Sequence, residues 1–132
     1  MMHMSVQDRA RIAQRHIAKT AIDLVCDAYE VSPSLVLAAG RSQAHISLAR
    51  QVSIYIAHVV GQLNLTQLSE EFNRDRSTVS HACHIVEDRR DSTLFDKQMT
   101  FLEKEYDRQL MELYRNWLSE SSYYKSQIKN TG

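Results

Sequence analysis

The chain has 132 residues, of which 43% are hydrophobic, which predicts one folded domain with a core and excludes an intrinsically disordered chain. Three glycines and one proline are too few for the frequent turns of a strand-rich protein, so the composition predicts an all-α fold. The 16 basic and 16 acidic residues cancel, which argues against a strongly basic nucleic-acid-binding protein, although residues 31–69 contain no Asp or Glu.

Three helices are predicted in the first half of the chain. Ser5 is a candidate N-cap for the first of them. Ser32 and Pro33 suit the cap and the first position of a short second helix, which Gly40 ends. The third helix follows a polar loop and carries a wide apolar stripe. The predicted helical ranges are about 5–29, 33–39 and 45–60.

The next two helices form a predicted helix-turn-helix. Thr66 is a candidate N-cap for the short helix QLSEEF, and a second helix runs from about Arg76 to Asp88. A tight polar turn over residues 73–75 joins them. Two such helices are typical of DNA-binding motifs, in which the second helix enters the major groove. The same pattern also occurs in helical bundles that bind no DNA, so the pattern alone leaves both interpretations open.

A long amphipathic helix is predicted for the last third of the chain. Its apolar residues recur at spacings of three and four, close to a heptad seam of about three repeats. The seam predicts either a helix that packs on its own domain or one that forms a homodimer or binds a protein partner. The polar end of the chain is predicted to be a flexible tail. The seam consists of Phe95, Met99, Leu102, Tyr106, Leu110, Leu113 and Trp117.

Several segments resemble the C-terminal DNA-box-binding domain of the bacterial replication initiator DnaA. In that family an Arg-Gln pair opens a long helix, as Arg50-Gln51 does here, and the helix-turn-helix carries an Arg-Asp-His-Ser/Thr-Thr-Val motif followed by His-Ala-Cys. The matching segments are 74–79, RDRSTV, and 81–83, HAC. Upstream, VSPSLVLAAGRS at 31–42 is similar to the short helix and basic loop of the family. The resemblance covers about residues 18–105.

The resemblance implies a sequence-specific contact with double-stranded DNA. It implies base reading in the major groove by four residues and a minor-groove contact by Arg41. Asp can accept a hydrogen bond from cytosine, Arg can form a bidentate pair with guanine, and Thr can contact the thymine methyl group. These contacts fit this role. The backbone contacts are assigned to Arg50, Arg74 and His81. The implied base readers are Asp75, Arg76, Ser77 and Thr78.

Two departures from the family pattern bear on the DNA sequence that is recognised. Arg76 stands where the family has histidine, which replaces an imidazole by a longer bidentate fork. The turn before the motif is one residue shorter, since Asn73 alone replaces a glycine-rich pair. We therefore expect a related or different short sequence rather than the standard box of the family.

No catalytic, cofactor or metal site is predicted. The sequence has no GxxxxGK[ST] phosphate loop, so we expect no ATPase and no enzyme. His81 and His84 with Cys83 between them suggest zinc, but Cys83 falls on the inner face of its helix and the three would point apart.

The chain is expected to be cytoplasmic and associated with the nucleoid. It begins without the apolar run of a secretory signal, and no stretch approaches the ~20 apolar residues of a membrane span. Cys26 and Cys83 form no CxxC pair and are expected to be reduced.

Together these observations predict a regulator of transcription or of replication initiation that binds double-stranded DNA. The alternative is a protein-interaction module that kept the fold and lost DNA binding, which the neutral charge and the heptad-like helix favour. The predicted organisation is a DNA-binding domain over 1–92, an amphipathic helix over 93–120 and a tail over 121–132.

Overall fold

The computed structural model describes the backbone of residues 4–130 and the side chains of residues 4–120. Within this part of the chain the secondary structure consists of six helices and no strand, which confirms the all-α prediction. None of the described helices is long and apolar enough to cross a membrane. The helices are α1 (Val6–Tyr29), α2 (Pro33–Leu37), α3 (Ala44–Val59), α4 (Leu65–Phe72), α5 (Arg76–Arg89) and α6 (Thr93–Asn130).

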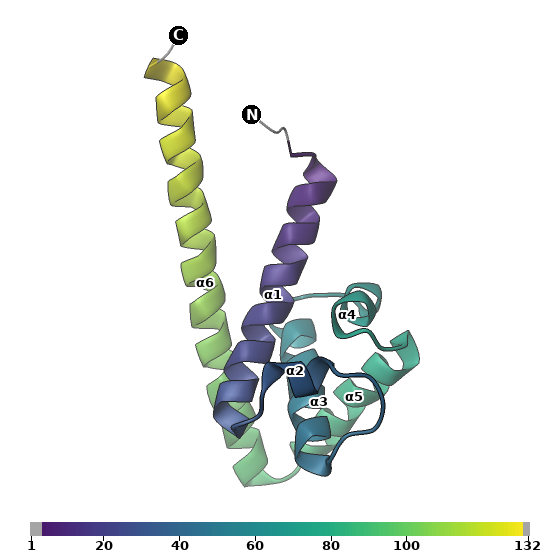
Figure 1. Ribbon diagram of the computed structural model, residues 1–132. Coiled ribbons are helices and arrows are strands. Elements are labelled where there is room, and N and C mark those ends of the chain that lie inside the picture. Colours follow the sequence, from purple (N-terminus) through teal and green to yellow (C-terminus); the bar gives the residue numbers. More distant parts are fainter. Residues whose placement is uncertain (1–3, 131–132) are drawn as a thin grey trace.

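The helices form a body and a two-helix extension. In Figure 1, α2, α3, α4 and α5 make up the body, and the second half of α1 packs against it. Helix α6 runs antiparallel to α1, so the N-terminal end of α1 and the C-terminal end of α6 project from the same side of the body (Figure 1). The helix-turn-helix of α4 and α5 lies on the other side of α1 from α6 in this view.

Local capping signals set the starts of two helices, α1 and α4. The hydroxyl of Ser5 accepts a hydrogen bond from the Asp8 amide at 3.1 Å, and the Asp8 carboxylate accepts one from the Ser5 amide at 3.3 Å. This capping box starts α1 where the sequence predicts it. Helix α2 starts at Pro33 as predicted but ends at Leu37, two residues earlier than expected.

The helix-turn-helix begins two residues earlier than predicted. Asn64, rather than Thr66, is the N-cap of α4. Its side chain accepts from the Gln67 amide, and the Gln67 side chain accepts from the Asn64 amide, both at 2.9 Å. At the other end of α4, Asn73 adopts the left-handed conformation with φ 51°. Asparagine tolerates this conformation better than most residues, so a single residue suffices to turn the chain toward α5.

Helix α3 lies at the centre of the core. Six consecutive residues from Val52 to Ala57 are buried, which shows that the helix is covered on nearly every side. It packs against each of the other five helices, most extensively against α1 and α5. Burial on nearly every side is consistent with the absence of acidic residues from α3 itself.

The first half of α6 belongs to the same core. Met99, Leu102, Tyr106 and Leu110 are at most 5% exposed and join one hydrophobic cluster with residues of α1, α3 and α5. The Tyr106 hydroxyl donates a hydrogen bond to the Ile17 carbonyl at 2.7 Å. A boundary at residue 92 therefore does not separate two cores. Of the two alternatives for the seam, packing on the chain's own domain applies to its first half.

The second half of α6 extends beyond the core. Leu113 and Trp117 of the seam are only partly buried, and Trp117 meets the His16 ring edge-to-face with centroids 5.8 Å apart. Helix α6 continues to Asn130, through most of the segment for which the sequence predicts a flexible tail. No glycine or proline occurs from 93 to 130 to end the helix. Residues 131–132 of the predicted tail lie outside the described residues.

Candidate nucleic-acid interface

The predicted base-reading residues share one exposed helix turn. Asp75, Arg76, Ser77 and Thr78 are all exposed at the start of α5. The later turns of the helix are fixed in the core by Val79, Ala82, Cys83 and Val86, which are at most 7% exposed. Burial thus begins one turn into α5, and the first turn is open to solvent. The structure brings the four predicted residues together on this turn.

The polar side chains of this turn are not engaged in hydrogen bonds within the described part of the fold. Asp75 occupies the N-cap position of α5, but its side chain makes no capping hydrogen bond. The first amides of a helix have no partner within the helix, and the N-terminal end carries a partial positive charge. A carboxylate, a guanidinium and two hydroxyls therefore project from a helix end that favours anions. Such a set suits contact with the bases and phosphates of a DNA groove.

The loop between α2 and α3 presents Arg41. Gly40 adopts φ 88°, a left-handed backbone conformation that favours glycine, and this turn precedes the exposed Arg41. The surface here is hollowed to about 430 Å³, with Gln43 and His45 also among the lining residues. Gln43 and His45 were missing from the predicted site. Their only signal in the sequence is their position in a segment without acidic residues.

Arg74 joins the turn of the helix-turn-helix to this loop. Its Nη2 donates to the Ala38 carbonyl at 2.7 Å, and its Nη1 donates to the Asn73 carbonyl at 3.2 Å and the Phe72 carbonyl at 3.4 Å. The guanidinium thus connects the end of α4 to the segment after α2. The sequence predicted a phosphate contact for Arg74 and gave no signal for this link.

Arg50 lies inside the fold rather than on its surface. The residue is 9% exposed, and its Nε donates to the Val36 carbonyl at 2.7 Å. Its Nη2 donates to Ser42 Oγ at 3.1 Å and reaches the Leu35 carbonyl at 3.5 Å. Burial, together with the nearby charge of Arg74, lowers the pKa of Arg50. The phosphate contact expected of Arg50 does not follow from this geometry, because the residue is buried and its Nε and Nη2 bind α2 and the loop.

The histidines and the cysteine of α5 do not converge. His81 and His84 are exposed on α5, whereas Cys83 is buried. Burial, with a smaller effect of the Glu87 charge, raises the pKa of the Cys83 thiol to about 11. Among residues 4–120, no group of three His, Cys, Asp or Glu side chains is placed to hold a metal ion. His81 is one turn beyond Ser77, and its exposed side chain remains available for a contact with the DNA backbone.

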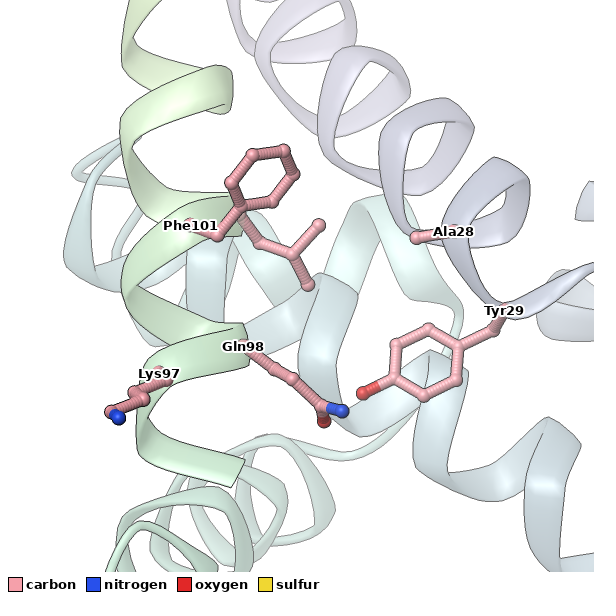
Figure 2. Close-up of a pocket in the computed structure, with 6 residues that line it drawn as sticks. Ala28, Tyr29, Lys97, Gln98 and Phe101 are labelled. Atoms are coloured by element: carbon pink, nitrogen blue, oxygen red, sulfur yellow. The ribbon is translucent and has the colours of Figure 1, made fainter. Parts of the chain in front are cut away.

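A separate groove of about 400 Å³ lies between the end of α1 and the first half of α6 (Figure 2). Tyr29 and Gln98 point toward each other across it, and the exposed ring of Phe101 stands at its rim (Figure 2). None of the residues predicted from the sequence to contact DNA lines this groove. Its lining consists of Ala28, Tyr29, Lys97, Gln98, Phe101 and Leu102.

The arrangement of helices matches a known family. A family model described as the bacterial dnaA protein helix-turn-helix matches residues 18–86, more than half of the chain. The chain belongs to this DnaA helix-turn-helix family. The matched region includes the loop with Arg41, helix α3 and almost all of the helix-turn-helix. Membership of the DnaA family supports DNA as the partner of the exposed turn.

Two solved structures are similar to this chain. A crystal structure of a DNA replication initiation factor is 26% identical, with a TM-score of 0.71, over 78% of this chain and 32% of the other. A structure of the replication initiator DnaA bound to AMPPCP and single-stranded DNA is 25% identical, with a TM-score of 0.68, over 76% and 31%. This chain therefore spans about a third of the length of these DnaA-like proteins. No curated protein matches it.

Proposed function

We propose that this protein binds double-stranded DNA sequence-specifically through the first turn of α5. The observation that carries the proposal is the exposed set of Asp75, Arg76, Ser77 and Thr78 at the start of a helix whose later turns are anchored in the core. Direct readout needs side chains that differ in hydrogen-bonding character and reach the base edges from a rigid helix. The first turn of α5 meets both requirements. Membership of the DnaA helix-turn-helix family supports the same conclusion.

The neutral charge of the chain limits the phosphate contribution. The affinity that comes from phosphate contacts grows with the number of Lys and Arg side chains that contact the DNA phosphates. Arg50 is engaged inside the fold and Arg74 is hydrogen-bonded to three carbonyls, so few free cations remain near α5. We therefore infer that base contacts contribute a large share of the specific affinity, and that binding to random DNA is weak.

The biological role we propose is regulation of transcription or of replication initiation. The proposal includes DNA binding alone and no catalytic step. The support is that the chain belongs to the DnaA family and is similar to two initiator structures along about a third of their length. We further propose that it acts inside the cell on the nucleoid, where its DNA would be found.

The experiment that tests the proposal compares two arginine substitutions that each remove one positive charge. Arg76→Ala removes an exposed side chain from the proposed interface, and Arg115→Ala removes an exposed one from α6. We expect Arg76→Ala to weaken binding to the preferred duplex by about 1–3 kcal/mol and to relax the preference at one base pair. Arg115→Ala should change neither quantity.

Two outcomes would contradict the proposal. Equal losses for the two variants would indicate that only overall charge matters. Weak binding without sequence preference in the wild-type protein would favour the alternative, an interaction module that kept the fold and lost DNA binding. Fluorescence anisotropy with labelled duplexes at fixed salt measures both variants, because salt sets the electrostatic contribution.

A further inference from the structure

The segment from α2 to the loop with Arg41 is held by two arginines from different parts of the fold. Arg50 of α3 donates to the Val36 carbonyl at 2.7 Å and to Ser42 Oγ at 3.1 Å. Arg74, in the turn of the helix-turn-helix, donates to the Ala38 carbonyl at 2.7 Å. The last carbonyls of a helix have no partner within the helix and carry partial negative charge, so they attract guanidinium groups. Together the arginines bind carbonyls along most of this short segment.

The two arginines have different mechanical roles. Arg50 connects the segment to α3 within the core, whereas Arg74 connects it to the turn that directly precedes α5. Ala38 lies three residues before Arg41, and Arg74 lies two residues before Arg76. The bond from Arg74 to Ala38 therefore fixes the loop with Arg41 relative to the first turn of α5. Gly40, with φ 88°, turns the chain between Ala38 and Arg41.

We propose that Arg74 is a positioning residue that sets the separation between the contact made by Arg41 and the contacts made by the first turn of α5. The inference rests on the proposed DNA-binding function. It implies that the loop and α5 read one DNA site as a single rigid unit. Arg41 can contribute to binding only while the loop is held at the correct distance from α5.

A direct phosphate contact is the competing role for Arg74. Its guanidinium has five N–H donors, and three carbonyls from two segments already accept hydrogen bonds from it. A lysine in its place would keep the charge but could not span two separate groups of carbonyls, because its ammonium is a compact point charge. Arg74→Lys therefore distinguishes positioning from charge.

The decisive experiment is a double-mutant cycle between Arg41 and Arg74 on the duplex that the wild-type protein prefers. We expect Arg41→Ala to weaken binding about tenfold in the wild-type background, the loss of one good contact. In the Arg74→Lys background the same substitution should cost at least about threefold less than in the wild-type background, since the loop keeps its bonds to Arg50 but loses its link to the turn before α5. Arg76→Ala should cost the same factor in both backgrounds.

The opposite result is equally clear. If Arg74→Lys binds as the wild type does, or if Arg41→Ala costs the same factor in both backgrounds, Arg74 does not position the loop. A phosphate role predicts in addition that Arg74→Ala lowers the slope of log K against log salt by about one. Positioning predicts that Arg74→Ala lowers the slope only while Arg41 is present, so that the slope does not change further when Arg74→Ala is added to Arg41→Ala. Thermal unfolding of each variant verifies that it is folded.

A measurement without DNA separates failure of this inference from failure of the proposed function. Hydrogen exchange of the amides from Ala39 to Ser42 should be faster in Arg74→Lys than in the wild-type protein, because the loop loses its link to the turn. Unchanged exchange would overturn the positioning role even if the protein binds DNA. Suppose that exchange is faster in Arg74→Lys but the wild-type protein selects no DNA sequence. This result would support the link between Arg74 and the loop and would refute the DNA-binding function.

Discussion

Replacing Gly61 by alanine should strongly destabilise the domain, because a methyl group has no room where α1, α3 and α6 meet. A Cβ at this position would lie 2.6 Å from the Ala57 carbonyl oxygen, 2.6 Å from the Tyr106 hydroxyl and 2.7 Å from Ile17 Cγ2. All three distances are below any normal van der Waals contact. Two of the three neighbours also form the hydrogen bond that joins α6 to α1, from the Tyr106 hydroxyl to the Ile17 carbonyl.

The expected magnitude combines two effects. Overpacking of a tight core costs about 1–3 kcal/mol. Displacement of Tyr106 also breaks its hydrogen bond to Ile17, which contributes about 1 kcal/mol. The free energy of unfolding should therefore fall by about 2–4 kcal/mol in Gly61→Ala. This is a large part of the roughly 5–15 kcal/mol that stabilises a domain.

Urea unfolding followed by circular dichroism measures this loss, and Tyr106→Phe provides the partner for a double-mutant cycle. Without the hydroxyl, one of the three close contacts of the new methyl group is absent. Gly61→Ala should then cost at least about 0.5 kcal/mol less in the Tyr106→Phe background than in the wild-type background. Stability of Gly61→Ala within about 0.5 kcal/mol of the wild type would refute this account of how α6 joins the core.

Two further predictions concern α6. Truncation after Arg90 should abolish cooperative thermal unfolding, since it removes four core side chains, whereas a cooperative transition in the truncated chain would show that residues 1–90 fold alone. On the outer face of α6, Met111 is 54% exposed, and we expect Met111→Lys to change the free energy of unfolding by less than about 0.5 kcal/mol. A loss of about 2 kcal/mol or more in urea unfolding would contradict the placement of this face outside the core. The four core side chains are Met99, Leu102, Tyr106 and Leu110.

Much of the fold follows from local sequence. Ser5 and Pro33 start helices because a capping side chain and a preset φ angle act within one turn of the chain. The start of α4 was misplaced because Asn64 and Thr66 are both good caps, and only the reciprocal bonds with Gln67 decide between them. The continuation of α6 to Asn130 was not predicted because the polarity of residues 119–130 indicates exposure, whereas the absence of Gly and Pro permits the helix to continue.

The candidate site likewise has features that could be predicted from the sequence and features that could not. The inward face of α5 could be predicted from the spacing of Val79, Ala82 and Val86, whereas the exposure of residues 75–78 depends on the start of α5 extending beyond its neighbouring helices. The roles of Arg50 and Arg74 could not be predicted, because their partners are carbonyls 14 and 36 residues away along the chain. Such contacts depend on how α2 packs against α3 and the turn. A charged residue beside a motif is assigned to the ligand by default when its tertiary partners are unknown.

The most direct test of DNA binding is selection of the wild-type protein against random duplexes at about 0.1 M salt, where nonspecific phosphate binding is limited. The account predicts enrichment of one short motif, related to the box of the DnaA family but altered at the base pair that Arg76 contacts. Selection with Arg76→Ala in parallel should lose the preference at that base pair alone. Failure of the wild-type protein to enrich any sequence would contradict the assignment of α5 as a recognition helix.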